Sequence, residues 1–225
     1  MTTTTPRQRF LQNLSHAIAG IHCAHPVRVG IDGVDASGKT TLADELVAPL
    51  TALGRTVVSA SIDGFHRPRS ERYKLGRQSP EGYFRDSFQL HRVVADLLEP
   101  LGPGGSRRIK RAVFDYRADA PVHLPEEEVP PDAILVFDGI FLHRPELISQ
   151  WDATIYLDVP FDITVRRAAE RDGWPPEVEA VENRRYVEGQ RLYLRECQPQ
   201  SVASMVVDNS DLARPVIVTT RAPLR

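Results

Sequence analysis

The sequence predicts an α/β fold, a three-layer sandwich in which helices cover both faces of a mainly parallel central sheet. Short apolar strands alternate with longer segments of helical periodicity along the 225 residues, and this alternation is typical of parallel sheets. Two strands, over 133–137 and 153–157, are almost wholly apolar, as expected for strands buried on both faces. No internal repeat or clear boundary divides the chain, so we predict a single domain over residues 1–225.

The first half of the chain carries five clear elements. In order, they are a helix over 7–21, a strand over 27–31, a glycine-bounded loop over 33–38, a helix over 40–53 and a strand over 56–62. The first helix follows from Phe10, Leu14 and Ile18, which recur every fourth residue, as the apolar face of a helix requires. The next segment, over 67–85, is polar and basic with Gly and Pro, so we expect a long functional loop there.

The second half continues the alternation. The expected elements, in order, are a helix over 87–98, a Gly/Pro turn over 101–106, a strand or hairpin over 109–116, an acidic and Pro-rich loop over 120–132, the two apolar strands, helices over 162–171 and 178–196, and short strands over 205–208 and 216–219. The late strands extend the sheet that the earlier ones begin.

The composition is that of an ordinary globular protein, with 41% hydrophobic and 26% charged residues. At a formal net charge of -2, no overall basic field draws the chain to nucleic acid. No apolar run approaches the roughly 20 residues that span a bilayer, and two cysteines are too few for a disulfide framework. We expect a cytoplasmic protein that binds a small molecule, with no nucleic-acid or membrane partner; homo-oligomer formation stays open.

The most informative segment is the loop over 33–40, which matches the pattern G-x-x-x-x-G-K-[ST] in full. Glycines let consecutive backbone N–H groups face inward and bind phosphate, and the following helix adds its positive N-terminal end. Lys39 can reach the β- and γ-phosphates, and the Thr40 hydroxyl can bind Mg²⁺. The predicted nucleotide-binding residues of this segment are Gly33, Asp35, Ala36, Ser37, Gly38, Lys39, Thr40 and Thr41.

Chance is a weak explanation for this match to the phosphate-binding pattern. Of the 28 basic residues only Lys39, Lys74 and Lys110 are lysines, which leaves 25 arginines, so a lysine at the required position is informative. The alternative is a glycine-rich turn without a ligand, but the predicted strand before the loop and helix after it supply the context that a phosphate site needs.

Two carboxylates are expected at the same edge of the sheet as this loop. Asp138 follows the apolar strand over 133–137, and Asp63 follows the strand over 56–62. Ligands of open α/β sheets bind at the carboxyl ends of the strands. Asp138 would help Thr40 to hold Mg²⁺, and Asp63 could accept the proton of an acceptor hydroxyl or orient that hydroxyl for in-line attack. The alternatives are an Asp-Gly turn after the strand and an Asp63 that only caps a loop.

With these residues and several further blocks, the chain resembles the phosphoribulokinase/uridine kinase family of P-loop kinases. The resemblance covers about residues 26–210. Beyond the glycine-rich loop, the matching blocks are Ser61-x-Asp63-x-Phe65, Ser79-Pro80-x-x-x-Phe84-x-x-Ser87-Phe88, Ala112-Val113-Phe114-Asp115-Tyr116, Phe137-Asp138-Gly139 and Arg166-Arg167 to Arg171-Asp172. The loop is highly specific for nucleotide binding, and the block around Asp63 is fairly specific for these kinases.

The resemblance implies a fold and an activity. The fold is that of P-loop kinases, related to nucleoside triphosphate hydrolases, with a mobile lid around 162–196 and an acceptor-side insertion around 64–132. The activity is transfer of the γ-phosphoryl group of ATP to a hydroxyl group of a small molecule, with Mg²⁺ as cofactor. Asp63 would be the catalytic base, and Asp138 would help to hold the metal.

The resemblance also assigns a role to arginines of the lid. Arg166 and Arg171 would act in catalysis beside Asp63 and Lys39, and Arg167 would bind the nucleotide. Guanidinium groups suit the charge that spreads over the equatorial oxygens during phosphoryl transfer. Since the chain holds 25 arginines among its 28 basic residues, a solvated helix face remains an alternative for each of the three.

The chain departs from uridine-cytidine kinases on the acceptor side. Those enzymes usually have the stretch Y-D-F-x-x-H-x-R, and here Phe114 stands at the Tyr position and Asp119 at the His position. One change removes a hydroxyl group, and the other replaces a potential cation with an anion, which alters the groups that could recognise a base. Uridine itself is therefore in question. The predicted acceptor-binding residues are Asp63, Phe65, His66, Tyr83, Phe114, Asp115, Arg117 and Asp119.

Three functions remain open at this point. They are a nucleoside kinase of the uridine/cytidine type, a kinase for pantothenate, a sugar phosphate or glycerate, and a regulatory NTPase or nucleotide-sensing module. A switch usually needs a water-positioning residue and partner-facing segments, so Asp63 and the arginine-rich lid favour a kinase. The basic segment over 67–77 could be a nucleic-acid arm, but its place just after Asp63 favours contact with an anionic or polar acceptor, with a solvated loop as the plain alternative.

Overall fold

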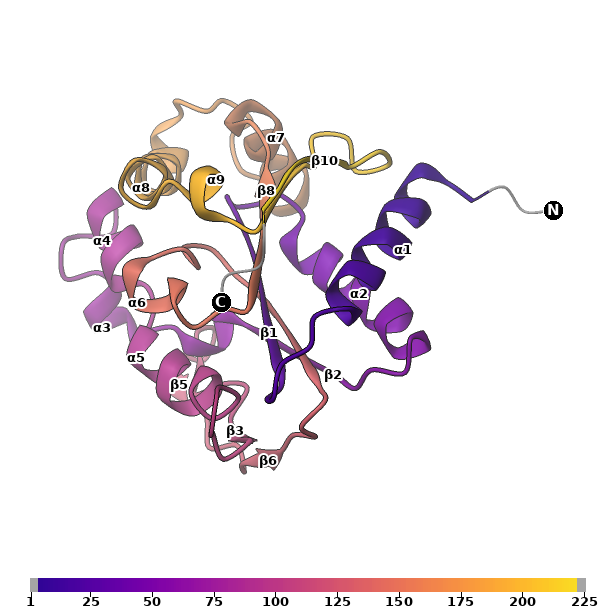
Figure 1. Ribbon diagram of the computed structural model, residues 1–225. Coiled ribbons are helices and arrows are strands. Elements are labelled where there is room, and N and C mark those ends of the chain that lie inside the picture. Colours follow the sequence, from indigo (N-terminus) through magenta and orange to yellow (C-terminus); the bar gives the residue numbers. More distant parts are fainter. Residues whose placement is uncertain (1–3, 222–225) are drawn as a thin grey trace.

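A computed structural model describes residues 4–221, which form a six-stranded sheet between layers of helices (Figure 1). The strands lie in the order β10-β9-β8-β1-β7-β2. Their bounds are β1 Val27–Gly33, β2 Val57–Ser61, β7 Ile134–Asp138, β8 Ala153–Asp158, β9 Met205–Asp208 and β10 Val216–Thr220. Neighbours run parallel except β10, which pairs antiparallel with β9. The predicted α/β fold with a mainly parallel sheet is confirmed.

Helices cover both faces of this sheet. The long helices are α1 (Pro6–Ala19), α2 (Lys39–Ala52), α7 (Phe161–Asp172) and α8 (Val181–Cys197). Shorter helices are η1 (Ile62–Phe65), α3 (Arg69–Arg72), α4 (Pro80–Asp86), α5 (Leu90–Val93), the π-helical η2 (Val94–Leu98), α6 (Pro145–Ile148) and α9 (Pro199–Val202). Two small ladders complete the described part, β3 (Arg108–Ile109) with β6 (Glu127–Glu128) and β4 (Phe114–Asp115) with β5 (Ala120–Pro121).

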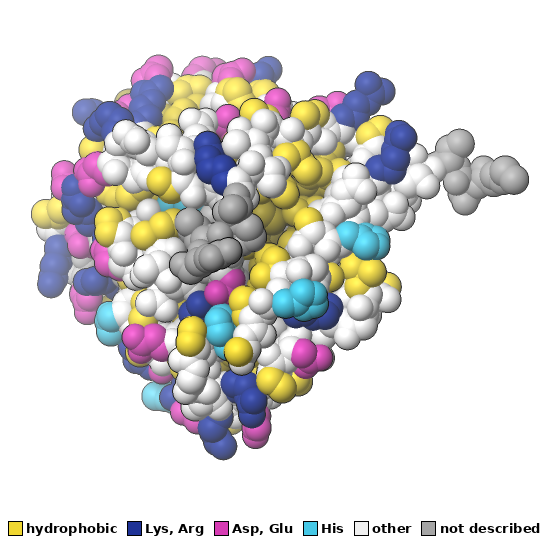
Figure 2. All heavy atoms as spheres, viewed as in Figure 1, with side chains coloured by type: hydrophobic (Ala, Val, Ile, Leu, Met, Phe, Trp, Pro, Cys, Tyr) yellow, Lys and Arg dark blue, Asp and Glu magenta, His cyan; other side chains and the backbone are white. Residues whose placement is uncertain are grey.

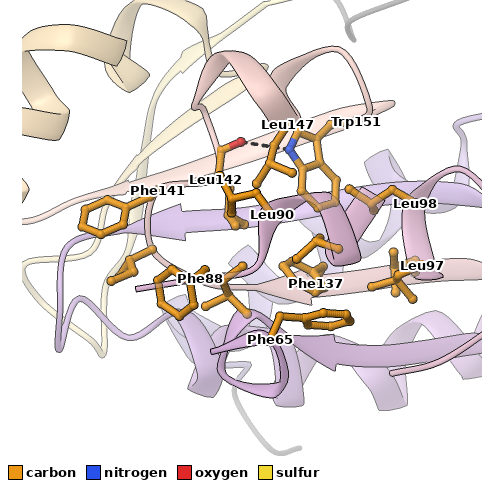
Figure 3. Close-up of a cluster of buried hydrophobic side chains, with 14 of the residues drawn as sticks. Phe65, Phe88, Leu90, Leu97, Leu98, Phe137, Phe141, Leu142, Leu147 and Trp151 are labelled. Atoms are coloured by element: carbon orange, nitrogen blue, oxygen red, sulfur yellow. Dashed lines mark hydrogen bonds between the residues drawn. The ribbon is translucent and has the colours of Figure 1, made fainter. Parts of the chain in front are cut away.

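Alternation along β7 divides the core between the two faces. Ile134 and Val136 pack into a cluster with residues of α1 and α2, whereas Leu135 and Phe137 pack into a second cluster with residues of α4, α5, η2 and α6. Figure 3 shows this second cluster, with Phe137 among apolar side chains from several elements. Because strand side chains alternate between faces, a strand that is apolar at every position must be covered on both.

The region between β2 and β7 differs in detail from the sequence-based expectation. The predicted loop over 67–85 contains α3 and α4, and the predicted helix over 87–98 begins only at α5 and continues as η2. The expected strand or hairpin over 109–116 is split between β3 and β4, whose partners β5 and β6 lie in the predicted loop over 120–132. α4 begins with Ser79, whose hydroxyl accepts from the Gly82 N–H, and Pro80, which is a standard helix start.

Charged side chains of both signs are interspersed over the face drawn in Figure 2, as the small net charge of -2 leads one to expect. Within residues 4–221, no helix has the length and apolar character needed to cross a membrane. The boundaries of the insertion around 64–132 and the mobility of the lid around 162–196 stay predictions.

Candidate active site

The glycine-rich loop joins β1 to α2 and is shaped by its glycines. A Cβ atom on Gly33 would lie 2.6 Å from Ser37 Oγ, and one on Gly38 would lie 2.7 Å from Asn209 Nδ2. Gly38, the N-cap of α2, also has a φ of +98°. Residues with a side chain disfavour this left-handed backbone conformation. The tight turn therefore presents backbone N–H groups and the helix N-terminus on one side, as a phosphate site requires.

Two polar groups of this loop fit an anionic ligand. Lys39 is only 9% exposed, and its ammonium group donates to the Val34 carbonyl at 2.7 Å. Burial lowers the pKa of Lys39, while the charges of Asp35, Asp32 and Asp138 act in the opposite direction. Ser37 Oγ is buried and has no hydrogen-bond partner among residues 4–221. A bound phosphate would supply the negative charge that this buried amine needs.

Thr40 and Asp138 meet beside the loop, since the parallel β1 and β7 end at the same edge of the sheet. The Thr40 hydroxyl donates to Asp138 Oδ2 at 2.6 Å. Burial raises the pKa of Asp138, against the opposing effects of the Thr40 hydrogen bond and the Lys39 charge. A hydroxyl and a carboxylate are the hard oxygen donors that Mg²⁺ prefers, so the predicted pair fits this metal.

Two cavities open at this edge of the sheet. The first, which we call the nucleotide cavity, has a volume of about 410 Å³ and is lined by the glycine-rich loop, Lys39, Thr40 and Asp138. The second, which we call the acceptor cavity, has a volume of about 680 Å³ and lies toward α3, α7 and α8. Five residues line both cavities, namely Asp35, Asp63, His66, Tyr83 and Arg171. Groups bound in the two cavities would therefore meet beside Asp63 and Arg171.

Asp63 is the second residue of η1, which follows β2 directly. Its N–H donates to Ser61 Oγ at 3.3 Å, and its side chain is exposed. His66 closes the same turn. Its Nδ1 lies 3.0 Å from the Asp63 carbonyl oxygen, and its ring lies between those of Phe88 and Tyr116, with centroid distances of 4.6 and 4.8 Å. Burial lowers the pKa of His66. These contacts fix the turn and leave the Asp63 carboxylate free to face a ligand.

Asp35 is held between two helices. Its carboxylate accepts from the Tyr83 hydroxyl at 2.7 Å and from Gln190 Nε2 at 3.2 Å, and its N–H donates to Gln190 Oε1. Tyr83 lies on α4 and Gln190 on α8. The glycine-rich loop is thus braced against both helices that border the acceptor cavity.

Comparison with known proteins agrees with this geometry. The uridine kinase of Leuconostoc citreum is 33% identical over 157 residues, which cover 65% of this chain and 69% of that protein. The chain belongs to the phosphoribulokinase/uridine kinase family of P-loop kinases.

Solved structures share the fold of this family. The structure of a possible uridine kinase from Bacillus stearothermophilus has a TM-score of 0.69 at 23% identity, covering 88% of this chain and 97% of that chain. Phosphoribulokinase from Rhodobacter spheroides has a TM-score of 0.53 at 17% identity, covering 89% and 76%. No family model matches the chain. The protein is a P-loop kinase of this family, and its acceptor is considered below.

The three predicted lid arginines occupy three different environments. Arg171 lines both cavities and pairs with Asp172 at 2.7 Å. Arg167 lines the nucleotide cavity and donates to the carbonyls of Asn209 and Ser210. Arg166 lines neither cavity; it is paired with Asp162 one helical turn away, and its side chain is 61% exposed. The structure therefore brings two of the three predicted arginines to the site.

Two predicted acceptor-binding residues are core residues in this kinase, and those predictions are wrong for this structure. Phe65 is fully buried, with its ring centroid 6.3 Å from that of Phe137, and Phe65 appears in the apolar cluster of Figure 3. Phe114 is 4% exposed and packs in the same cluster. Neither ring lines the acceptor cavity, because each points into the protein rather than toward the sheet edge.

Of the other residues in the 114–119 stretch, Tyr116 and the predicted Arg117 line the acceptor cavity. The Asp115 carboxylate accepts from the N–H groups of Arg117 and Ala118 and so stabilises its own turn. Asp119 accepts from the Arg69 N–H at 2.9 Å and pairs with Arg72 at 3.4 Å. Asp119 therefore anchors α3 to the turn between β4 and β5 and does not line the cavity.

Sequence reasoning missed the part of the acceptor cavity that α8 and the segment before it provide. The lining residues there include Trp174, Asn183, Arg185, Tyr186 and Gln190. Arg72 and Tyr73 also line the cavity, and they lie in the basic segment over 67–77, for which contact with the acceptor was the favoured prediction. The polar residues of α8 gave no such signal, since a buried Arg on a helix has the same sequence pattern as an exposed one.

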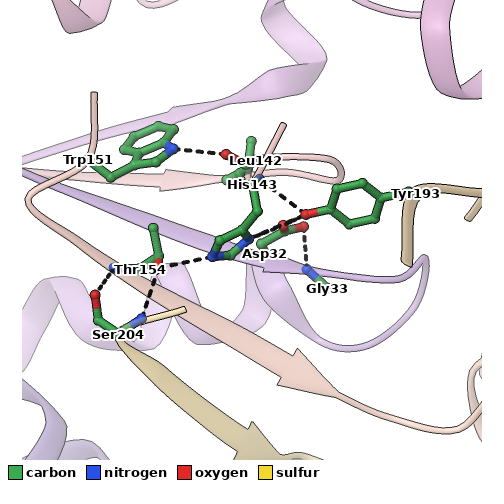
Figure 4. Close-up of polar contacts among 8 residues, drawn as sticks. All are labelled: Asp32, Gly33, Leu142, His143, Trp151, Thr154, Tyr193 and Ser204. Carbon is green, nitrogen blue, oxygen red and sulfur yellow. Dashed lines mark hydrogen bonds and ion pairs between the residues drawn. The ribbon is translucent and has the colours of Figure 1, made fainter. Parts of the chain in front are cut away.

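A buried polar network supports the loop from below (Figure 4). Asp32, which directly precedes Gly33, accepts from the Gly33 N–H at 2.7 Å and from the Tyr193 hydroxyl. Its Oδ2 lies 2.6 Å from His143 Nδ1, and His143 Nε2 lies 2.9 Å from Thr154 Oγ1. All of these side chains are buried, so the network ties β1, β8 and α8 together beneath the nucleotide cavity.

A second cluster could offer metal ligands by geometry alone. Cys23, His25 and Asp152 place one ligand atom each within 4.8 Å of one another. Both oxygens of Asp152, however, accept from the guanidinium group of Arg28, at 3.0 Å each. Because that ion pair already satisfies the carboxylate, the cluster is better explained as structural.

Replacing Asp138 with asparagine is expected to stabilise the ligand-free kinase at neutral pH while weakening catalysis. Burial raises the pKa of Asp138 above its ordinary value of 3.8, so the folded state binds a proton here more tightly than the unfolded chain does. The carboxyl group therefore favours folding below pH 3.8 and loses that effect as pH rises through the folded-state pKa. Thermal unfolding should show a higher Tm for the variant, by about 2–4 °C for each kcal/mol gained.

Two controls accompany this measurement. The Tm difference should be largest at neutral pH and should shrink as the pH falls through the raised pKa of Asp138 toward its ordinary value of 3.8. Mg-ATP turnover should fall by about 10- to 100-fold, the usual cost of losing a group that orders a metal's ligands. If Asp138→Asn has a lower Tm than the wild type at pH 7, the ionised Asp138 does not destabilise the folded protein and the prediction is wrong.

Proposed function

We propose that this kinase transfers the γ-phosphoryl group of ATP to a hydroxyl group of a small metabolite. The observation that carries the proposal is the meeting of the two cavities at Asp63 and Arg171. One cavity has the phosphate-binding loop, and the other has room for a small molecule. An NTPase without an acceptor has no need of the second cavity, which at about 680 Å³ is within the usual size range of ligand pockets.

The residues would divide the chemistry as follows. The loop N–H groups and Lys39 would hold the phosphates, and Thr40 with Asp138 would hold Mg²⁺, which offsets phosphate charge when bound. Asp63 would accept the proton of the acceptor hydroxyl as its oxygen forms the new bond to phosphorus. The bond from that phosphorus to the oxygen bridging to the β-phosphate breaks, and ADP leaves. Arg171 would stabilise the charge on the transferring group.

Two classes of acceptor are candidates. The relative from Leuconostoc citreum is named a uridine kinase, which supports a nucleoside acceptor. The second candidate is a non-nucleoside such as pantothenate, glycerate or a sugar phosphate. It is favoured by the burial of Phe114, which stands where uridine-cytidine kinases have a pyrimidine-contacting Tyr, and by the arginines that line the acceptor cavity.

The test is ADP release from Mg-ATP in the presence of uridine, cytidine, pantothenate, glycerate and sugar phosphates, each added separately. We expect release to depend on one acceptor class and the acceptor to be recovered in phosphorylated form. Steady ADP release that is indifferent to every acceptor would contradict the proposal and favour a regulatory NTPase.

A further inference from the structure

Several arginines line the part of the acceptor cavity that is not shared with the nucleotide cavity. Arg72 of α3 and Arg185 of α8 line the cavity, although they are only 8% and 6% exposed. Arg69 and Arg117 line the same cavity from more exposed positions. Buried guanidinium groups are costly unless a negative charge and hydrogen-bond acceptors surround them, so the partners of Arg72 and Arg185 decide what this part of the cavity can bind.

Arg185 lacks an anionic partner. Its Nη1 donates to the Arg77 carbonyl at 2.7 Å, but its buried Nε has no hydrogen-bond partner, and no carboxylate of residues 4–221 forms an ion pair with it. Its guanidinium carbon lies 4.7 Å from the ring centroid of Tyr73 and 5.5 Å from that of Tyr83. Cation–π contacts offset part of the cost of burial, but they satisfy none of the in-plane N–H donors.

Arg72 is only partly neutralised and, like Arg185, lies beside the Tyr73 ring. Its Nη2 is 3.4 Å from Asp119 Oδ1, an oxygen that also accepts from the Arg69 N–H, and its buried Nε has no partner within the described chain. Its guanidinium carbon lies 5.6 Å from the same Tyr73 ring that Arg185 covers. Burial raises the pKa of Tyr186, and the positive charges of Arg185 and Arg72 oppose that shift, which places both arginines near one phenol group.

The carboxylates that line the acceptor cavity either have hydrogen-bond or ion-pair partners already or lie at the junction with the nucleotide cavity. Asp172 pairs with Arg171, and Asp35 accepts from Tyr83 and Gln190. Asp63 and Asp35 lie at the junction with the nucleotide cavity. The cavity therefore has acids where the hydroxyl would react and under-neutralised arginines in the part that is not shared with the nucleotide cavity.

We propose that the acceptor carries an anionic group, a carboxylate or a phosphate, which Arg185 and Arg72 bind while Asp63 faces the hydroxyl. This inference rests on the proposed function and names the chemical class of its acceptor. Planar guanidinium groups bind both kinds of anion through paired N–H donors. An anion between them would supply the missing charge and would set the distance between the anchored group and the reacting hydroxyl.

The experiment compares pairs of acceptors that differ only in the anionic group. Suitable pairs are glycerate with glycerol, pantothenate with panthenol, and ribose 5-phosphate with ribose, with uridine as a neutral nucleoside. ADP release should respond to an anionic member and not to its neutral partner, and the carboxylate and phosphate pairs distinguish the two sources of charge. Efficient turnover of uridine or another neutral acceptor would overturn the inference and leave the proposed function intact.

Substitution of Arg185 tests the residue itself. Arg185→Met should lower kcat/KM for the anionic acceptor by roughly 10- to 100-fold, mostly through KM, as expected for loss of a charged hydrogen bond, and Arg185→Lys should recover part of it. Arg184→Met is the matched control, because Arg184 is exposed on the same helix and should leave turnover unchanged. Equal losses in both Met variants would contradict a role in binding the anion.

Calorimetric titration keeps the inference testable without turnover. With ADP filling the nucleotide cavity, an anionic member of a pair should bind the wild-type protein more tightly than its neutral partner, and Arg185→Met should remove the difference. If charged and neutral members bind alike, or neither binds, the inference is wrong. ADP release that ignores all acceptors would instead count against the proposed function.

Discussion

Replacing Asp63 with asparagine is expected to lower the acceptor-dependent kcat by about 10²- to 10⁴-fold, the range that a positioned general base contributes. The amide keeps the size of the side chain and its place at the start of η1, but it cannot take up the hydroxyl proton. Asp63 is exposed at the junction of the two cavities, so the substitution disturbs no core packing. Nucleotide binding should change little, because the phosphates lie on the glycine-rich loop.

Single-turnover measurement of phosphorylated acceptor checks this prediction, with ADP affinity measured separately. Asp44→Asn is the matched control, since Asp44 is an exposed carboxylate on α2 that lines neither cavity. A loss below about 10-fold for Asp63→Asn would mean that Asp63 only orients the hydroxyl or plays no part. A comparable loss in the control would point to a general effect on folding.

The nucleotide half of the site could be predicted because its information is local. The loop over 33–40 contains its own phosphate donors, and the strand before it and the helix after it follow from short-range periodicity. Asp138 and Asp63 could be placed because parallel strands end at one edge of a sheet, and the register of β7 with β1 and β2 aligns their ends.

The acceptor half could not be predicted in the same way. The block around Asp63 gives no information about the direction of Phe65, which turns into the core toward Phe137 because η1 bends the chain after β2. Arg185 and Tyr73 come together only when α8 packs beside α4. Arg185 and Arg77, whose carbonyl accepts from Arg185, are 108 positions apart in the sequence. Such contacts depend on tertiary packing, which sequence periodicity does not encode.

Helix α8 connects this tertiary information to the nucleotide site. Gln190 bonds to Asp35 within the glycine-rich loop, and Tyr193, one turn further along, bonds to Asp32 just before the loop. The same helix carries Arg185 into the acceptor cavity. We therefore expect motion of the lid to be largest in α7 and in the segment that joins α7 to α8. Helix α8 should move less, because its motion would break its hydrogen bonds to the glycine-rich loop.

Replacing Asp32 with alanine is expected to lower the free energy of unfolding by about 3–5 kcal/mol, because it removes a buried carboxyl group on which several buried polar groups depend. The Asp32 side chain is fully buried and serves the Gly33 N–H, the Tyr193 hydroxyl and His143 Nδ1. Its loss would leave three buried donors without an acceptor, at about 1–3 kcal/mol each before relaxation. A typical domain has only about 5–15 kcal/mol in total, so this variant should be marginal at 37 °C.

Urea unfolding followed by tryptophan fluorescence measures the effect, with Trp151 as a buried reporter. Tyr193→Phe should cost less, about 1–3 kcal/mol, because it removes one hydroxyl and leaves the Asp32–His143 contact in place. Asp44→Ala, at an exposed position, should stay within about 0.5 kcal/mol of the wild type. If the free energy of unfolding of Asp32→Ala also stays within about 1 kcal/mol of the wild type, the network does not stabilise the fold. Its contact with Gly33 would then matter only for nucleotide binding. A raised KM for ATP in Tyr193→Phe, at a temperature where it remains folded, would show that α8 positions the phosphate loop through this same hydroxyl.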